Sequence, residues 1–271
     1  MIVIGMTGPI GHGKSTFAAA LKELEPRSTH LESSLIIAEV ANDMHAVLPK
    51  NAPSSFRVWH ERTTANIPDP YNLDELNSWL SKLPEILRAR VGQTADFERI
   101  KLDPLAIEEH PIEYQKLIMH VEALKREPRL ASQPITKENK EKYRPFLQWL
   151  GGYLAQKVSK SIWYDEIVRR VQAAESQGCE LCIIGGMRFP SDATTLRQVD
   201  NVVICKVYRP GHLQNDMLDP TERERDNIPV DCTIASNSTV DDLKVTAAQI
   251  LKDIQSNNLQ PNYQASRAKS A

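Results

Sequence analysis

Short apolar runs and longer stretches with apolar residues at helical spacing alternate along the chain. Five short segments have the length and composition of strands, the second only weakly: Ile2–Met6, Ser28–Leu31, Leu181–Ile184, Val202–Tyr208 and Cys232–Ala235. Helical spacing predicts helices over residues 14–24, 35–48, 76–87, 114–124, 146–158, 163–171 and 240–254. Residues 49–72, rich in Pro, Asn and Ser, predict a loop, and the polar residues 256–271 predict a disordered tail.

The order of these elements indicates the architecture. Strand–helix units stand at both ends of the chain, and a purely helical block lies between them. This pattern is typical of an α/β fold in which a helical insertion interrupts a parallel sheet. We therefore expect a five-stranded, mostly parallel sheet in a core of residues 1–44 and 141–255, with an all-helical insertion over residues 45–140.

Composition and charge argue against nucleic-acid and membrane partners. The 271 residues are 41% hydrophobic and 25% charged, with a net charge of −2, as in an ordinary globular protein. Without a global positive charge the chain has no field to hold DNA or RNA, so we expect no stable nucleic-acid partner. No window of about 20 apolar residues is present, and the apolar start MIVIGMTGPIG lacks a basic leader. The chain is therefore expected to be cytoplasmic and to have no membrane partner.

The four cysteines need separate treatment, because Cys179 and Cys182 have the C-x-x-C spacing of some metal sites. Both lie in a strand-like run, where an offset of three residues points the two side chains to opposite faces. Cys205 and Cys232 also lie in predicted strands. We expect core cysteines rather than a zinc site or a disulfide framework.

The segment from Gly8 to Ser15, GPIGHGKS, fits the P-loop (Walker A) pattern G-x-x-x-x-G-K-[ST] between a predicted strand and a predicted helix. Its glycines allow backbone N–H groups to turn toward a phosphate, and the helix N-terminus adds its dipole. Lys14 is placed to reach the β- and γ-phosphates, and the Ser15 hydroxyl to bind Mg²⁺. His12 is expected to be an exposed loop residue. The residues expected to hold the nucleotide are Gly8, Gly11, His12, Gly13, Lys14, Ser15 and Thr16.

Further sequence features favour one kind of P-loop protein. The D-x-x-G and N-K-x-D motifs of GTPases do not occur in the chain. The strand LCIIGG ends in Gly185-Gly186 rather than in the acidic pair of a motor ATPase, and Arg188 follows at the sheet edge where ligands bind. A helical insertion that closes over a small acceptor suits a small-molecule kinase with a P-loop NTPase fold.

These residues resemble the phage-type deoxynucleoside monophosphate kinases, a family of P-loop nucleotide kinases. Beyond the P-loop, the likeness is carried by four pieces. Three are Arg144-Pro-Phe-Leu-Gln-Trp-Leu-Gly151, Trp163-Tyr164 and Ile183-Ile-Gly-Gly-Met-Arg188, and the last, which resembles the family's lid and last strand, is Val207-Tyr-Arg-Pro-Gly211 with Thr221-Glu222 followed by Asp231-Cys-Thr-Ile-Ala-Ser-Asn237. Gly186 stands where the family tends to place an Asp, and the last piece is shared with the similar dephospho-coenzyme A kinases. Residues 45–140 match no part of the family pattern.

The resemblance implies transfer of a phosphoryl group from ATP, with Mg²⁺, to a (deoxy)nucleoside monophosphate. Lys14, Arg144 and Arg188 would be catalytic. Arg144, Arg188, Trp163 and Tyr164 would hold the acceptor, and Arg209 and Asn237 the donor. A salt bridge is the alternative for each of Arg144 and Arg188, core packing for Trp163 or Tyr164, and a helix N-terminal turn for Asn237.

A lid and a metal contact complete the expected site. Arg209, Arg223 and Arg225 lie in a stretch from which we expect a mobile lid over residues 210–228, with a solvated charge run as the alternative. Glu32 is a weak candidate for a water-mediated Mg²⁺ contact.

Two other functions stay open, a kinase similar to dephospho-coenzyme A kinase and a non-catalytic nucleotide-binding protein. The expected partners are small-molecule nucleotides, and a homodimer stays open.

Overall fold

The computed structural model describes residues 1–48, 78–91, 111–212, 224–236 and 239–264. The chain divides into two compact units. The first contains Met1–Ser33 and Tyr164–Ala271, and the second contains Ser34–Trp163. The second unit is therefore longer at both ends than the predicted insertion of residues 45–140.

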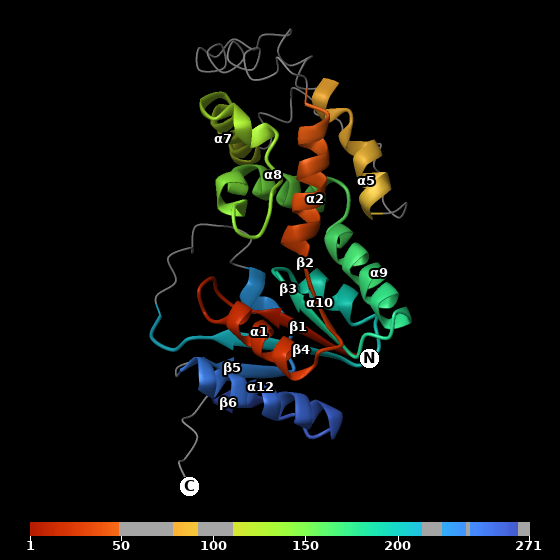
Figure 1. Cartoon of the computed structure of the whole chain (residues 1–271), viewed down its shortest axis with the longest axis vertical. Coiled ribbons are helices and arrows are strands. Elements are labelled where there is room, and N and C mark those ends of the chain that lie inside the picture. Colours follow the sequence, from red (N-terminus) through yellow and green to blue (C-terminus); the bar gives the residue numbers. More distant parts are fainter. Residues whose placement is uncertain (49–77, 92–110, 213–223, 237–238, 265–271) are drawn as a thin grey trace. The chain divides into compact units, whose positions relative to one another are not determined.

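A six-stranded, all-parallel sheet forms the centre of the first unit (Figure 1). The strand order is β2-β3-β1-β4-β5-β6. The strands are β1 (Ile2–Thr7), β2 (Ser28–Glu32), β3 (Leu181–Gly185), β4 (Val202–Tyr208), β5 (Cys232–Ala235) and β6 (Asn262–Gln264). The α/β class and the parallel sheet are confirmed, whereas the predicted count of five strands is wrong by one.

The sixth strand comes from the polar segment that was predicted to be disordered. β6 pairs with β5, with Asn262 opposite Thr233. Its anchor is Tyr263, which is only 8% exposed and whose hydroxyl donates to Asp253 Oδ2 at 2.9 Å and accepts from the Gln260 N–H at 2.9 Å. One buried aromatic ring with a satisfied hydroxyl thus orders this part of a segment whose composition alone predicts disorder.

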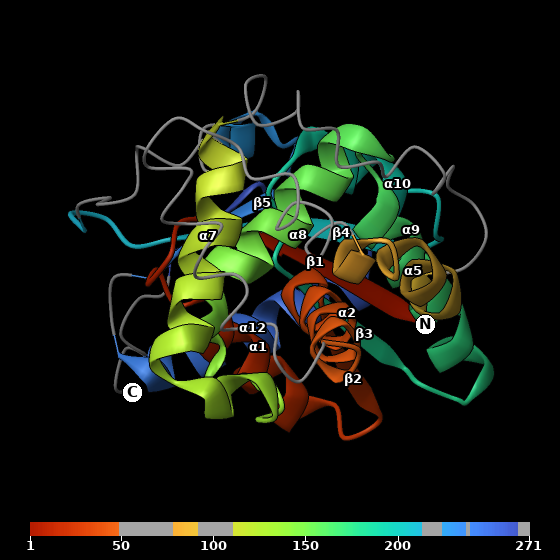
Figure 2. The same cartoon turned by 90° about the horizontal axis from the view of Figure 1, so that it is seen from above.

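Helices cover both faces of this sheet. In Figures 1 and 2, α1 (Lys14–Leu24) and α12 (Val240–Gln255) lie over one face, and α9 (Ile162–Ser176) and α10 (Pro190–Leu196) over the other. A short 3₁₀ helix, η4 (Glu224–Asn227), precedes β5. A Cβ at Gly5 would meet Leu196 of α10 at 3.0 Å, so α10 packs closely on its face.

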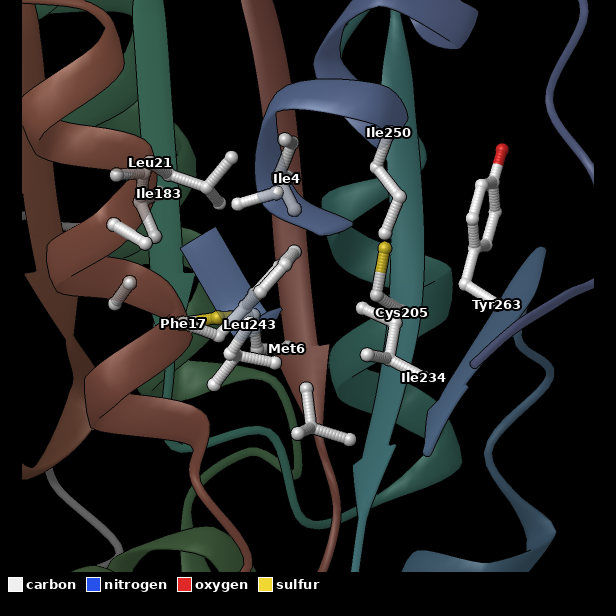
Figure 3. Packing of buried hydrophobic residues seen from close by; sticks show 14 of the residues in the cluster. Ile4, Met6, Phe17, Leu21, Ile183, Cys205, Ile234, Leu243, Ile250 and Tyr263 are labelled. Atoms are coloured by element: carbon white, nitrogen blue, oxygen red, sulfur yellow. The ribbon is translucent and has the colours of Figure 1, made fainter. Parts of the chain in front are cut away.

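The core between the sheet and the pair α1 and α12 is shown in Figure 3. Phe17 and Leu21 of α1 and Leu243 and Ile250 of α12 are almost completely buried there, together with Ile4, Met6, Ile183, Cys205, Ile234 and Tyr263 from the strands. Burial of each large apolar side chain contributes about 1.5–3 kcal/mol. This core fixes α1 against the sheet, and α1 begins directly after the glycine-rich loop.

Three of the four cysteines are confirmed as core residues. Cys182, Cys205 and Cys232 are buried, and Cys205 and Cys232 lie opposite each other in β4 and β5 with their Sγ atoms 3.0 Å apart. Cys179 precedes β3 and is half-buried. The expectation that Cys179 and Cys182 share a strand is therefore wrong. Within the described ranges, no group of three or more His, Cys, Asp and Glu side chains could hold a metal ion.

In the described part of the second unit the regular elements are helical: α2 (Ser33–Ala46, with Ser33 in the first unit), α5 (Leu83–Val91), α7 (Pro111–Arg126), η2 (Pro128–Ala131), η3 (Lys140–Tyr143) and α8 (Arg144–Lys157). Phe146 of α8 stacks against Trp149, Trp79 and His120 at centroid separations of 6.0, 5.7 and 4.3 Å. The predicted loop of residues 49–72 lies outside the described residues. No helix in the described ranges is long and apolar enough to cross a membrane.

Two histidines form a buried pair in this aromatic cluster. The Nε2 atoms of His45 and His120 lie 2.8 Å apart, and the rings stack with an interplanar angle of 10°. One Nε2 must therefore carry the proton that the other accepts. Burial lowers the pKa of His45 to about 4, and burial together with His45 lowers the pKa of His120 well below its usual value. Both rings are consequently neutral at neutral pH.

This pair should make the second unit sensitive to acid. In the unfolded chain each histidine takes up a proton as the pH falls below its ordinary pKa of 6.5, whereas the folded state resists protonation. The stabilisation is therefore complete above pH 6.5 and is lost as the pH falls toward 4. For His45 alone the loss by pH 5 is on the order of 2 kcal/mol.

The test is the free energy of unfolding, measured by urea denaturation at pH 7 and pH 5. The double variant His45→Gln/His120→Gln should lose less stability between the two pH values than the parent chain. His212→Gln, at an exposed histidine, is the control and should behave as the parent does. Equal pH dependence in all three proteins would contradict the assignment.

Candidate functional site

The segment Gly8–Ser15, called the glycine loop below, joins β1 to α1 and lies tightly against neighbouring backbone. Gly8, Gly11 and Gly13 have φ angles of 132°, 79° and 94°, which favour glycine. A Cβ at Gly8 would lie 2.0 Å from the carbonyl oxygen of Val207 in β4, and a Cβ at Gly13 would lie 2.7 Å from Ser236 Oγ. The loop can follow this path only because these positions carry no side chain.

The start of α1 suits an anion. Gly13, the N-cap residue, makes no side-chain cap, and the first turn contains no acidic residue. The Gly13 position therefore supplies no side-chain acceptor to the first N–H groups of the helix. These N–H groups form the positive end of the helix dipole. Ser15 is exposed and Thr16 is half-buried on this first turn. The Ser15 hydroxyl is thus accessible to a metal ion.

The Lys14 ammonium folds back over the glycine loop. Its Nζ donates to the carbonyl oxygens of Gly8 and Pro9 at 2.5 and 2.6 Å. A partly buried cation is thereby held beside the N-terminus of α1. The helix dipole and this ammonium together give the glycine loop a positive potential.

His12 is not exposed, so that expectation is wrong. The residue is only 4% exposed, and its Nδ1 accepts the backbone N–H of Arg209 at 2.9 Å. The His212 ring lies edge-on at a centroid distance of 5.1 Å. Burial, followed by the charges of His212, Lys14, Arg225 and Arg209, lowers the pKa of His12. The imidazole ties the glycine loop to the end of β4, a contact between residues far apart in sequence.

Two of the predicted lid arginines therefore belong to the surroundings of the glycine loop. Arg209 follows β4 and is exposed. Arg225 lies in η4 and is only 4% exposed, so a solvated charge run does not describe it. Arg223, Asn237 and most of the predicted lid lie outside the described residues.

A second cluster lies at the end of β3, where three hydroxyl groups bind three successive carbonyl oxygens. Tyr164 donates to Gly185 O at 3.5 Å, Ser33 to Gly186 O at 3.3 Å and Thr7 to Met187 O at 3.3 Å. The three donors come from α9, from the first residue of α2 and from the end of β1. They hold the backbone that leads directly to Arg188.

Asp192 fixes the next part of this backbone. Its Oδ2 accepts the N–H groups of Arg188 and Phe189 at 2.8 and 2.9 Å, and so caps α10. Burial nevertheless raises the pKa of Asp192 to about 6. Sequence analysis missed this residue, although Pro190 followed two positions later by an acid is a recognisable signal for a helix start.

Glu32 lies against the glycine that ends β3. A Cβ at Gly185 would meet Glu32 Cγ at 3.0 Å, and the Glu32 carboxylate is 3.4 Å from His30 Nε2. The glycine thus leaves room for a carboxylate from the neighbouring strand. The charges of Asp192, Arg188 and Glu32 all act on the buried Tyr164 hydroxyl, whose pKa is raised well above 10 mainly by burial.

The predicted acceptor residues are divided between the two units. Tyr164 and Arg188 belong to the first unit, whereas Arg144 and Trp163 belong to the second. Trp163 is 6% exposed and donates to Gly151 O at 3.2 Å, and Tyr164 is 1% exposed. These observations favour the packing alternative for both rings. The half-exposed Arg144 pairs with Glu141 at 3.1 Å, which is the salt-bridge alternative.

A separate hollow of about 720 Å³ lies at the opposite edge of the sheet, where the strands begin. Its lining includes Ile2, Leu181, Val202 and Asp231. It contains none of the predicted site residues. The glycine loop and the Arg188 segment lie instead at the carboxyl ends of β1 and β3, the edge at which parallel α/β sheets bind ligands.

No protein-family model and no curated protein sequence matches this chain. Evidence for a function therefore comes from the two clusters themselves. The glycine loop offers an anion site with Lys14 and the first turn of α1. The segment from Gly185 to Arg188 offers a rigidly supported arginine at the same edge of the same sheet.

The energetic cost of a side chain at Gly8, which lies close to β4, can be tested by measuring the free energy of unfolding. Gly8→Ala should lower the free energy of unfolding by roughly 2–4 kcal/mol, because it combines an unfavourable φ with a backbone clash. Gly178→Ala is the matched control in the same unit. Gly178 has a φ of 81° but nothing within 4 Å of its Cβ position, so only about 1–2 kcal/mol should be lost. If urea denaturation gave equal losses of unfolding free energy for the two variants, the close approach of Val207 would not contribute to the cost of Gly8→Ala.

Proposed function

We propose that this chain is a P-loop kinase that transfers the γ-phosphoryl group of ATP to a (deoxy)nucleoside monophosphate. The proposal places it with the phage-type deoxynucleoside monophosphate kinases and gives the sheet a P-loop NTPase fold. The observation that carries it is the glycine loop, which sits between a central strand and an uncapped helix N-terminus and holds a lysine ammonium against its carbonyls.

The residues of the glycine loop fit the phosphates of a nucleotide. Cβ atoms at Gly8 and Gly13 would collide with neighbouring atoms, so the bare backbone is a requirement of the site. Lys14 would exchange its loop carbonyls for phosphate oxygens, and the exposed Ser15 hydroxyl is available to Mg²⁺. Bound there, Mg²⁺ would neutralise charge on the donor phosphates.

The reaction needs charge and orientation more than a protein nucleophile. An oxygen of the acceptor phosphate forms a bond to Pγ, the bond from Pγ to the β-phosphate oxygen breaks, and ADP leaves with the electron pair. Lys14 stabilises the charge that develops on that oxygen. Arg188 holds the acceptor phosphate through a planar guanidinium that matches two phosphate oxygens.

Support for the role of Arg188 comes from the backbone before it. Hydroxyl groups of Thr7, Ser33 and Tyr164 and the carboxylate of Asp192 fix residues 185–189. A guanidinium on such a backbone loses less conformational freedom when it binds. The resemblance also assigns Arg144 to the acceptor.

Glu32 favours a second acceptor class. A hydroxyl acceptor, as in a reaction similar to that of dephospho-coenzyme A kinase, must lose a proton during attack, whereas a phosphate acceptor is already ionised. The Glu32 carboxylate at the end of β2, beside Gly185, is placed at the ligand edge of the sheet to accept that proton. The acceptor panel below includes both classes.

The deciding experiment measures ADP formation from ATP and Mg²⁺ with no acceptor, with each ribo- and deoxynucleoside monophosphate, and with dephospho-coenzyme A. We expect turnover that depends on one or a few monophosphates. Lys14→Ala should fold normally and lower kcat by about two orders of magnitude. Binding of ATP without acceptor-dependent turnover would indicate a non-catalytic nucleotide-binding protein and would overturn the proposal.

Arg188 should act on the acceptor alone. Arg188→Ala should reduce kcat/KM for the monophosphate by roughly 10- to 100-fold, as expected for loss of a charged hydrogen bond, while the Kd of ATP stays the same. Arg188→Lys should recover only part of the loss, because lysine lacks the planar fork. Arg144→Ala should show the same pattern.

Arg197→Ala is the control for these variants. Arg197 lies just after α10 and pairs with Asp231 at 2.9 Å, and its removal should leave acceptor kinetics unchanged. Steady-state kinetics and calorimetric ATP binding separate the two sites. If Arg188→Ala weakens ATP binding and spares the acceptor, the acceptor assignment is wrong.

A further inference from the structure

The imidazole of His12 has one nitrogen in use and one buried without a partner. Nδ1 accepts the backbone N–H of Arg209 at 2.9 Å. Nε2 is buried and has no hydrogen-bond partner among the described residues, although the whole residue is only 4% exposed. A buried polar atom of this kind is unfavourable unless something binds it.

The contact with Arg209 determines which nitrogen carries the proton. A backbone N–H can only donate, so Nδ1 must present its lone pair. The neutral ring therefore carries its hydrogen on Nε2. Burial and nearby cations lower the pKa of His12, which keeps the ring neutral at neutral pH. His12 thus presents an N–H donor that lacks an acceptor.

The charges around this donor indicate what the acceptor is. Three of the groups that lower the pKa of the ring, Lys14, Arg225 and Arg209, are permanently cationic side chains. They come from the glycine loop, from η4 and from the residues just after β4. Cations gathered around a buried N–H donor, beside an uncapped helix N-terminus, match an anion with several oxygen atoms.

We propose that His12 donates its Nε2–H to a phosphate oxygen of the nucleotide held by the glycine loop, and that the backbone N–H of Arg209 fixes the tautomer required for this bond. The inference rests on the proposed function in taking a nucleotide as the ligand. It adds a side-chain donor to a site otherwise built from backbone N–H groups and Lys14. It also couples phosphate binding to the chain that follows β4, because one ring contacts both.

Nuclear magnetic resonance of the imidazole nitrogens tests the proposal directly. The probes are inorganic tripolyphosphate and ATP, each added to the ¹⁵N-labelled full chain. Before addition, the His12 spectrum should show a bare Nδ1 and a protonated Nε2. Addition should shift the Nε2 and Nε2–H resonances and leave the proton on Nε2. A proton on Nδ1, or an Nε2 resonance that does not move while the probe binds, would overturn the proposal.

Two substitutions divide the functions of the ring. His12→Asn keeps an acceptor near the position of Nδ1 for the Arg209 N–H but removes the distal donor. His12→Gln keeps a donor near the position of Nε2. The Kd of tripolyphosphate should rise about tenfold in His12→Asn, equivalent to about 1.4 kcal/mol, and less in His12→Gln. Arg197→Ala is the control, because Arg197 pairs with Asp231 and has no part in the glycine loop, and it should change the Kd less than twofold.

The outcomes separate this inference from the proposed function. If tripolyphosphate shifts Nε2 and His12→Asn weakens binding, the inference holds even when no acceptor is phosphorylated. If acceptor-dependent turnover is found but Nε2 and the Kd of His12→Asn are unchanged, the inference fails alone. If neither probe binds, both fail. Should His12→Asn not fold, the spectrum of the unmodified chain decides.

Discussion

The arrangement of the whole candidate site depends on the contact between Gly8 and β4. The carbonyl oxygen of Val207 occupies the space where any side chain at position 8 would begin. This absence of a side chain lets the chain leave β1, turn against β4 and enter α1 within a few residues. The helix N-terminus, Lys14 and His12 therefore all lie at the carboxyl edge of the sheet. The core under α1 holds the other end of the helix in place.

Around this constraint, the site is assembled from segments that are distant in sequence. Strands β1, β2 and β3 are neighbours in the sheet, so their carboxyl ends bring Thr7, Ser33 and Gly185 together. Tyr164 adds a donor from α9. The result is a main chain before Arg188 that is held by donors from three elements. We regard this support as the reason why a short segment with two glycines can carry the acceptor arginine of the proposed kinase.

Local patterns predicted the elements well, whereas contacts between distant segments could not be predicted. The helix Lys14–Leu24 and the strands Val202–Tyr208 and Cys232–Ala235 were predicted to the residue, because Gly, Pro and apolar periodicity act over short distances. The burial of His12 depends on Arg209, which is 197 positions away. Strand β6 depends on pairing with β5, about 30 positions earlier. No pattern within a short window reports such partners, whereas the Asp192 cap next to Arg188 is local and has a sequence signal.

The strand β6 has a consequence for how the sheet meets other molecules. A parallel sheet that ended at β5 would present the open hydrogen-bonding groups of that strand along its border, where another extended chain could attach. Residues 262–264 occupy that border, with Ile234 of β5 opposite Tyr263. The new outermost strand is only three residues long, too short to template further pairing. The segment therefore shields the β5 side of the sheet against pairing with another extended chain.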